Sequence, residues 1–374
     1  MITVNGEQRK IGLALSGGGF RASIFHMGVI RRLSELELLD KIDVISTVSG
    51  GSIVGAYYVL NKDKWDNIKE IEAGFETGLK ADLRGRGLTM SWAYHPLRFV
   101  KTLSSTYSRT NIMAEEYAKY FFGEKKLGEL PNTPKLIINA TSLNTGKIWK
   151  FQKELVGDDK FGFSPAPNFP IKNAVAASSA VPGVFAPLIL NKRDLKEMKI
   201  NPSYKNVNSV NLCDGGVRDN LGLTSVFDEK CDYILCSDAS QQLEDTISPS
   251  KYAVSVLLRS YNITMNAVKN LEIQLFSQEA NKVNKFRQIA FVNLVDHTDN
   301  GLPKTLVDQV VKIRTDLDNF SDDEIYTLIY HGYTLLDYRI KKYASDLLQG
   351  DIPPLKTEEF SKDQIKRLKN SLSN

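Results

Sequence analysis

Residues 11–60 read IGLALSGGGFRASIFHMGVIRRLSELELLDKIDVISTVSGGSIVGAYYVL, and this stretch decides the fold. It opens with an apolar run, Ile11–Leu15, that ends in three consecutive glycines, as expected for a buried strand entering a tight turn. Apolar residues recur at helical spacing over 25–39, β-branched residues over 42–48 predict a second strand, and small residues over 50–60 predict a buried helix. A strand–helix–strand–helix order predicts a parallel, doubly wound α/β sheet.

The remainder of the chain extends this core without a linker that would divide it. Residues 63–128 are polar and helical in pattern, with an interruption at 85–96, and Asn144-Thr145-Gly146 predicts a hairpin turn. The other expected elements are strands at 136–143, 147–151, 210–213, 233–236 and 288–294 and a short helix at 173–180. We predict a catalytic core over 1–238 that contains a helical cap excursion at 62–128. A mainly helical part at 239–374 is expected to pack on the same core.

Composition limits the classes of protein to which this chain can belong. Of its 374 residues, 42% are hydrophobic and 25% are charged, as in a globular protein with a sizeable core. The net charge of +4 is small and no nucleic-acid-binding module is present, so no nucleic-acid partner is expected. Neither a signal peptide nor a transmembrane segment is visible, and three cysteines suit buried thiols in a reducing compartment, which predicts a cytoplasmic protein. No metal-ligand spacing occurs, so neither metal nor cofactor is expected.

Ser49 is the first residue that could carry chemistry. It follows a β-branched strand and precedes Gly50-Gly51-Ser52 and a small-residue helix, as a nucleophile elbow requires. The strand delivers the serine to the sheet edge, and the helix N-terminus favours negative charge there. The usual G-x-S-x-G pattern is broken, because Thr47 stands where the first glycine belongs. An ordinary helix N-cap is the alternative for Ser49.

Gly17, Gly18 and Gly19, followed by Arg21, form a second candidate element. Consecutive glycines between a strand and a helix expose backbone N–H groups that can hold an anion. The loop could serve as an oxyanion hole or a phosphate site, or it could be a plain turn. As a dinucleotide fingerprint it is imperfect, since Ala22 replaces the last glycine.

Asp214 is the third candidate. It follows the strand at 210–213 and precedes Gly215 and Gly216, whose freedom lets the backbone turn sharply. A carboxylate at the end of a strand in an open α/β sheet lies where ligands bind. An aspartate that caps its own turn is the alternative. Asp238, after the strand at 233–236, is the reserve candidate for the same role.

Taken together, these motifs resemble the patatin-like phospholipase family. The segments that carry the resemblance are LALSGGGFRA, VISTVSGGSIVGA, AASSAVPGVFAPL (176–188) and CDGGVRDNLG (213–222), with NATSLNTG (139–146) and RTDLDNF (314–320) similar to bacterial members. The resemblance implies a three-layer fold with a mainly parallel sheet between helices. It also implies hydrolysis of phospholipid or other lipid acyl esters, of the phospholipase A or lysophospholipase type, by a metal-independent Ser–Asp dyad.

Carried onto this sequence, the resemblance assigns the nucleophile to Ser49 and the proton acceptor to Asp214. The oxyanion hole falls on the amides of the two glycine-rich turns, and neighbouring residues support the site. These residues are Gly17, Gly18, Gly19 and Gly50 for the oxyanion hole, and Arg21, Gly51, Gly215, Gly216 and Asn220 for support. The acyl-enzyme would be hydrolysed by a water activated through Asp214.

Other chemistries stay open at this point. A Ser–Asp–His triad could use His297 or His331, since both follow Asp214 in the chain, whereas His26 suits packing or capping. The same dyad could cleave soluble esters or thioesters. A non-catalytic α/β module could bind nucleotides or phosphates through the glycine loop.

Residues 81–110 form a candidate peripheral membrane contact. They mix five arginines and lysines with aromatic and aliphatic residues against a single acid, Asp82. Such a mixture suits the headgroup boundary of a bilayer. A cap whose apolar side packs on the core is the alternative.

Overall fold

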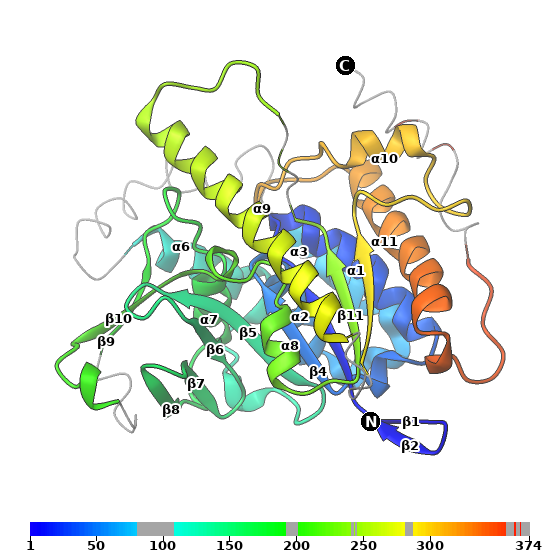
Figure 1. Ribbon diagram of the computed structural model, residues 1–374, viewed down its shortest axis with the longest axis horizontal. Helices are drawn as coiled ribbons and strands as arrows, with labels where there is room; N and C mark the ends of the chain where they lie inside the picture. The colour runs from blue at the N-terminus through cyan, green and yellow to red at the C-terminus, as the bar shows by residue number, and fades with distance from the viewer. Residues whose placement is uncertain are drawn as a thin grey trace.

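A mixed β-sheet with helices on both faces forms the body of the protein (Figure 1), which confirms the predicted α/β class. The computed structural model describes residues 1–80, 108–191, 201–240, 243, 245–280, 287–356, 363 and 367. The candidate membrane stretch 81–110 therefore lies outside the described residues, except for 108–110.

The main sheet has the order β12-β11-β3-β4-β5-β6-β7-β8, and β10 and β9 branch from β5. Its strands are β3 (Ile11–Leu15), β4 (Val44–Val48), β5 (Lys135–Ser142), β6 (Ile148–Phe151), β7 (Leu155–Asp158), β8 (Gly162–Pro165), β9 (Leu188–Asn191), β10 (Ser209–Asp214), β11 (Tyr233–Asp238) and β12 (Gln288–Asn293). The five strands from β12 to β5 are parallel, and the pairs beyond β5 are antiparallel. A separate hairpin joins β1 (Ile2–Val4) and β2 (Glu7–Arg9).

Strand β5 is the junction at which two strands of opposite direction meet. Its first part pairs in parallel with β4, and the last pair joins Val48 to Asn139. Its second part pairs with antiparallel β10, in which Asp214 lies opposite Ala140. Because β4 and β10 approach the same point of β5 from opposite ends, the residue after Val48 comes next to Asp214.

Helices cover the two faces of the sheet unequally (Figure 1). Their bounds are α1 (Gly19–Glu35), α2 (Gly50–Leu60), α3 (Ile68–Lys80), α6 (Arg109–Tyr117), α7 (Ile171–Ser178), α8 (Leu223–Asp228), α9 (Ala253–Ala280), α10 (Lys304–Val310) and α11 (Asp322–Tyr343). The larger hydrophobic core includes α1, α2, α3, α7 and α11, and a smaller core lies under α8 and α9. No helix in the described ranges is long and apolar enough to cross a membrane.

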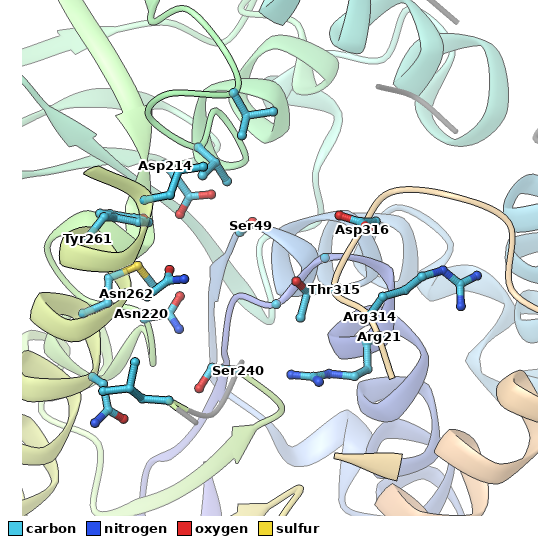
Figure 2. Close-up of a pocket in the computed structure, with 18 of the residues that line it drawn as sticks. Arg21, Ser49, Asp214, Asn220, Ser240, Tyr261, Asn262, Arg314, Thr315 and Asp316 are labelled. Atoms are coloured by element: carbon cyan, nitrogen blue, oxygen red, sulfur yellow. The ribbon is translucent and has the colours of Figure 1, made fainter. Parts of the chain in front are cut away.

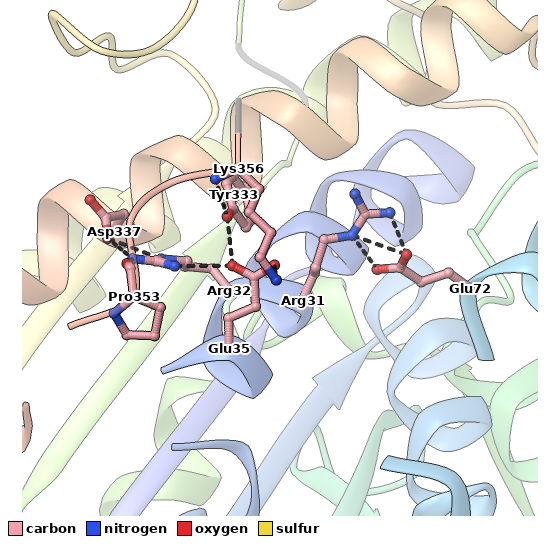
Figure 3. A network of polar contacts seen from close by, with 8 residues as sticks. All are labelled: Arg31, Arg32, Glu35, Glu72, Tyr333, Asp337, Pro353 and Lys356. Carbon is pink, nitrogen blue, oxygen red and sulfur yellow. Dashed lines mark hydrogen bonds and ion pairs between the residues drawn. The ribbon is translucent and has the colours of Figure 1, made fainter. Parts of the chain in front are cut away.

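A polar network fixes α1 to its neighbours on both sides (Figure 3). Arg31 forms a bidentate ion pair with Glu72 of α3, in which its Nε donates to Oε1 at 2.8 Å. Arg32 points the other way, donating to Asp337 of α11 at 2.6 Å and to the Pro353 carbonyl at 2.7 Å. Removing one partner of such a buried pair typically costs about 3–5 kcal/mol. The network therefore joins the C-terminal region firmly to the N-terminal sheet.

Helices α1 and α11 pack closely against each other where a glycine of each helix faces the other. A Cβ on Gly28 would clash with the Ile329 carbonyl of α11, and a Cβ on Gly332 would clash with the Phe25 carbonyl of α1. Glycine at both positions lets the two backbones touch. The C-terminal region is thus part of the same core as the sheet.

Most predicted elements lie where the sequence placed them. The strand at Ile11–Leu15 and the helix at Gly50–Leu60 have the predicted bounds, and the β5–β6 hairpin forms around Asn144-Thr145-Gly146. The described part of the predicted excursion is helical and packs into the main core through residues such as Phe75. Strands β7, β8 and β9 were not predicted, because they are four residues long and no Asn-Thr-Gly turn marks them as it marks the equally short β6.

Candidate active site

Ser49 lies on a strained turn between β4 and α2. Its φ of 49° and ψ of −118° are unusual for a residue with a side chain, and such a conformation typically costs about 1–3 kcal/mol. The following glycines make the turn sterically feasible. A Cβ on Gly50 would clash with the Gly19 carbonyl, and one on Gly51 would clash with the Leu15 carbonyl. The small residues expected at 50 and 51 are therefore required by close backbone approach, with Gly51 supporting the turn.

The departure from G-x-S-x-G at Thr47 is accommodated elsewhere in the fold. The Thr47 hydroxyl donates to the Ile137 carbonyl at 3.3 Å and accepts a bond from Ser52 at 3.0 Å. Its methyl group points at α2, where a Cβ on Gly55 would lie 2.6 Å from it. Gly55 of α2 thus leaves space for the Thr47 methyl group, space that a glycine at position 47 would not have needed.

Ser178, at the end of α7, holds the backbone of Ser49 in place. Its hydroxyl accepts a hydrogen bond from the Ser49 amide at 2.9 Å and donates to the Asn139 carbonyl at 2.6 Å. Its oxygen also lies 2.9 Å from the hydroxyl oxygen of Ser52. No local sequence pattern marks Ser178 as a functional residue. It lies in the 176–188 segment that carried the family resemblance, and that was the available signal.

The glycine loop between β3 and α1 divides into two parts. The Gly17 amide donates to the Asn220 carbonyl at 3.0 Å, so its assignment to the oxyanion donors is corrected: Gly17 joins two loops. Gly18 and Gly19 line the cavity beside Ser49, with φ of 140° and 58°. Gly19 and Gly50 begin α1 and α2, so their amides have no intrahelical acceptor.

Asp214 is a buried carboxylate that faces Ser49. It is 3% exposed, its Oδ1 accepts a hydrogen bond from the Gly216 amide at 2.7 Å, and the Ser49 side chain lies near enough to lower its pKa. Burial raises the pKa of Asp214 to about 7, and the Gly216 amide and the Ser49 side chain only partly oppose the rise. In the described part of the chain no cation contributes to this pKa. A carboxylate with such a pKa is a much stronger base than an ordinary aspartate.

The loop after Asp214 is held by two neighbouring side chains. Asn220 fits between the glycine loops, because a Cβ on either Gly17 or Gly216 would collide with its Oδ1. Asp219 accepts hydrogen bonds from the amides of Leu221, Gly222 and Thr224. Gly215 packs against the Asn139 carbonyl of β5, where a side chain would not fit. Gly215, Gly216 and Asn220 thus lie where supporting residues were expected.

Ser49 and Asp214 meet at one wall of a cavity of about 670 Å³ (Figure 2). A second wall comes from α9, whose Tyr261 and Asn262 lie on the same side of the cavity as Asp214. Aliphatic and aromatic residues from three segments line the interior, namely Val181, Val184, Phe185, Leu258, Met265 and Leu317. The volume is in the range of ligand pockets, and the lining suits a substrate with an apolar portion.

A C-terminal loop over residues 311–317 completes the cavity and was not predicted to do so. Arg21 donates to the carbonyls of Val311 and Ile313, both at 2.7 Å, so it anchors this loop. Arg314 binds Asp318 at 2.7 Å, which folds the loop. A Cβ on Gly19 would collide with the Thr315 carbonyl, so the loop packs directly against the backbone of Gly19.

The three histidines that the structure describes, His26, His297 and His331, do not line the cavity that contains Ser49 and Asp214. His26 bonds to the Ser237 hydroxyl at 2.7 Å and to the Ser16 carbonyl at 3.0 Å, and burial lowers its pKa to about 4. His331 bonds to the Leu294 carbonyl at 2.8 Å, and burial lowers its pKa to about 4 as well. His297 is exposed. The cavity lining includes no histidine among the described residues, which leaves a Ser–Asp–His triad without a base.

Asp238, the reserve candidate, has a different environment. Its carboxylate accepts bonds from the Ser240 amide and hydroxyl and lies 3.3 Å from Lys269. The three cysteines are buried free thiols. Across the described ranges, no three His, Cys, Asp or Glu side chains gather as metal ligands would.

Known proteins resemble this chain in sequence and in fold. Triacylglycerol lipase 4 of Saccharomyces cerevisiae is 30% identical over 223 residues, which are 58% of this chain and 23% of that protein. The chain therefore spans about a quarter of the length of that curated relative. Human GIVD cytosolic phospholipase A2 has a similar fold, with a TM-score of 0.54 and 13% identity, over 98% of this chain and 63% of that chain.

The same human protein in complex with a methyl γ-linolenyl fluorophosphonate inhibitor and terbium chloride matches equally, with a TM-score of 0.54 and 13% identity, over 98% of this chain and 60% of that chain. The sequence model of the patatin-like phospholipases matches residues 13–227, more than half of this chain, and this segment includes most of β3, the Ser49 turn and the Asp214 loop. This chain belongs to the patatin-like phospholipase family.

Proposed function

We propose that this protein is a lipid acyl hydrolase of the phospholipase A or lysophospholipase type, with Ser49 as nucleophile and Asp214 as general base. One observation carries the proposal: a serine on a strained strand–helix turn shares a cavity with a buried carboxylate whose pKa burial raises to about 7. Membership in the patatin-like phospholipases and the resemblance to a triacylglycerol lipase support a lipid ester as the substrate.

The proposed reaction begins with attack of Ser49 Oγ on the ester carbonyl while Asp214 takes the hydroxyl proton. The negative charge on the carbonyl oxygen would be stabilised by the amides of Gly18, Gly19 and Gly50 at two helix N-termini. One such donor is typically worth about 10²–10³ in rate. The alcohol leaves with the proton from Asp214, and a water activated by the same carboxylate then releases the fatty acid.

A fluorophosphonate probe tests the nucleophile directly. Ser49 should be labelled, and Ser49→Ala should abolish both labelling and ester hydrolysis, because the reacting oxygen is gone. Ser179→Ala is the matched control: Ser179 also lines the cavity, but its hydroxyl donates to the Val175 carbonyl at 2.8 Å. Residual activity above about 1% in folded Ser49→Ala would remove Ser49 from the mechanism.

Two substrates distinguish a lipase from an esterase that uses the same dyad. A lipid acyl hydrolase should cleave phospholipid in vesicles or micelles faster than a short-chain ester in solution. The apolar lining of the cavity, with Leu258, Met265 and Leu317, favours a long acyl chain. Preference for the soluble ester would replace the lipase proposal with the esterase one.

We further propose that the protein acts in the cytoplasm. Three free, buried thiols at Cys213, Cys231 and Cys236 suit a reducing compartment. Fractionation of cells that express the tagged chain tests this placement, and recovery from a secreted fraction would contradict it.

A further inference from the structure

Tyr261 is a hydrogen-bonding residue in the cavity wall that the proposed mechanism does not use. It lies in α9, where Leu258, Tyr261 and Met265 follow one another at helical spacing and line the cavity together with Ser49 and Asp214. Leu258 and Met265 give this side of the helix an apolar character, and the phenol adds a polar group to it. Contact with an apolar substrate therefore explains the two neighbours but not the hydroxyl between them.

Tyr261 lies close to the base of the proposed dyad. Helix α9 lies against the turn Gly215–Val217, which directly follows Asp214 in the chain. Burial raises the pKa of the Tyr261 phenol, and the Asp214 carboxylate lies near enough to raise it further. Figure 2 shows both side chains on the same side of Ser49. The hydroxyl therefore keeps its proton at neutral pH and is a hydrogen-bond donor near Asp214.

The Tyr261 hydroxyl has no hydrogen-bond partner among the residues that the structure describes. Partly buried tyrosine hydroxyls usually form such a bond. Elsewhere in this protein Tyr233 donates to Asp346 at 2.7 Å, and Tyr333 donates to Glu35 at 2.6 Å. A phenol that faces the cavity and lacks an acceptor of this kind is available to the molecule that fills the cavity.

The position of Tyr261 relative to Ser49 selects the substrate atom that it can contact. Thr315 packs against Gly19, in the glycine loop that is proposed to hold the carbonyl oxygen of the ester. In Figure 2, Thr315 lies on one side of Ser49, and Asp214 and Tyr261 lie on the other. Asp214 must reach the alcohol oxygen of the ester, because it returns the proton there. Tyr261 lies on the same side, so its hydroxyl can contact the same oxygen.

We propose that Tyr261 is a further catalytic residue, whose hydroxyl donates a hydrogen bond to the oxygen of the departing alcohol. The inference rests on the proposed function, since it assumes attack by Ser49 and proton transfer through Asp214. When the tetrahedral intermediate collapses, the bond between the acyl carbon and the alcohol oxygen breaks, and its electron pair moves to that oxygen. Asp214 transfers its proton to the same oxygen, while Tyr261 keeps its own proton and stabilises the developing charge. The alcohol then leaves as a neutral molecule.

Two soluble esters of the same short fatty acid test this role. A methyl ester releases an alkoxide that needs stabilisation, whereas a 4-nitrophenyl ester releases a phenolate that is already stable. Because both esters form the same acyl-enzyme, kcat/KM isolates the steps up to departure of the alcohol. Tyr261→Phe removes the hydroxyl and keeps the ring. It should lower kcat/KM about 10–100-fold for the methyl ester and by less than about threefold for the 4-nitrophenyl ester.

Tyr117→Phe is the matched control. Tyr117 is buried in α6, and burial and the Asp214 carboxylate raise the pKa of its hydroxyl as they do for Tyr261. Unlike Tyr261, it is not among the described residues that line the cavity. Tyr117→Phe should therefore change the ratio of the two kcat/KM values by less than about twofold. A change in this ratio as large as that in Tyr261→Phe would overturn direct contact between Tyr261 and the alcohol.

Equal losses of kcat/KM for the two esters in Tyr261→Phe overturn the proposal, because a purely structural role affects both alike. A loss confined to kcat at saturating ester also overturns it, since the hydroxyl would then act on the hydrolytic water. An active unmutated protein with an unchanged Tyr261→Phe variant overturns the role of Tyr261 alone. If the unmutated protein cleaves neither ester, the proposed function fails, and the role of Tyr261 is overturned with it.

Discussion

Strands β10 and β11 each end in a buried aspartate, yet the two carboxylates have opposite electrostatic surroundings. Asp214 ends β10, accepts a hydrogen bond from the Gly216 amide and faces the cavity that Ser49 also lines, and burial raises its pKa to about 7. Asp238 ends β11 and is held by Ser240 and by the buried ammonium of Lys269, 3.3 Å away. One carboxylate faces a hydroxyl in a cavity, and the other anchors a helix.

The difference shows how a fold assigns two roles to one residue type. A cation beside a carboxylate stabilises the charged form and lowers its basicity, whereas burial without a cation raises its basicity. Asp214 can therefore accept a proton near neutral pH. Asp238 is better suited to hold α9 against the sheet, so the reserve assignment of the base to Asp238 loses its support.

The largest effect should come from removing each acid in turn. Asp214→Asn removes the proton acceptor at nearly constant size, and we expect the hydrolysis of a soluble ester to fall about 10²–10⁴-fold. Asp238→Asn should keep activity within about tenfold in folded protein, because it touches no reacting atom. Steady-state kinetics on both variants, with circular dichroism as the folding control, checks the comparison. An equal loss of hydrolysis in the two variants would contradict the different roles assigned to the two aspartates.

The pH dependence of the rate should report the raised pKa of Asp214. Only the ionised carboxylate accepts a proton, so kcat/KM should rise with pH up to about 7 and be constant above it. Between pH 5 and pH 8 the gain should be about 100-fold, and residual activity of Asp214→Asn should lack this step. The buried His26 and His331 have their pKa values lowered to about 4 and cannot supply a step near 7. A flat profile in the unmutated protein would contradict this electrostatic account.

Stability should change in opposite directions in the two variants. Because the pKa of Asp214 is raised from 3.8 to about 7, the folded protein keeps a proton that the unfolded chain loses between these values. The free energy of unfolding therefore falls as pH rises through this window, and the cost persists above pH 7. Asp214→Asn should thus be more stable than the unmutated protein at pH 8, by about 1–3 kcal/mol, and show little gain near pH 4.

Asp238→Asn should instead be less stable by about 3 kcal/mol at pH 8, because Lys269 keeps its buried charge without a partner. Urea unfolding of the three proteins at both pH values measures these differences. A destabilised Asp214→Asn at pH 8 would show that its carboxylate is held by attractive contacts, as that of Asp238 is.

The smallest effect is expected from the exposed histidine. His297→Ala should leave kcat within about twofold and the pH profile unchanged, since its side chain reaches neither Ser49 nor Asp214. The same kinetic assay measures it. A loss as large as that of Asp214→Asn would restore the triad.

Local pattern was sufficient for the elements that carry the site. The apolar run before Gly17 predicted β3, the β-branched run before Ser49 predicted β4, and both strands formed as expected. Small residues after Ser49 predicted a tight turn, and the glycines at 50 and 51 do permit one. These features depend on neighbours in the chain, which a sequence displays directly.

Contacts between distant segments could not be read in the same way. The sequence predicted Gly17 as an oxyanion donor, but its amide is used by Asn220, some two hundred residues away. Ser178 supports Ser49 through one hydroxyl that no spacing rule marks. The walls formed by α9 and by residues 311–317 likewise depend on how the C-terminal region packs.

The sequence by itself determined that a serine ends one strand, that an aspartate ends another, and that each is followed by two glycines that permit a tight turn. Tertiary structure decided that they meet, because β4 and antiparallel β10 reach β5 from opposite ends, with Val48 beside Asn139 and Asp214 beside Ala140. It also decided that burial raises the pKa of Asp214, and that Asp238 is paired with Lys269. The pKa of a carboxyl depends on which groups surround it after folding, and Lys269 approaches only the second of these two acids.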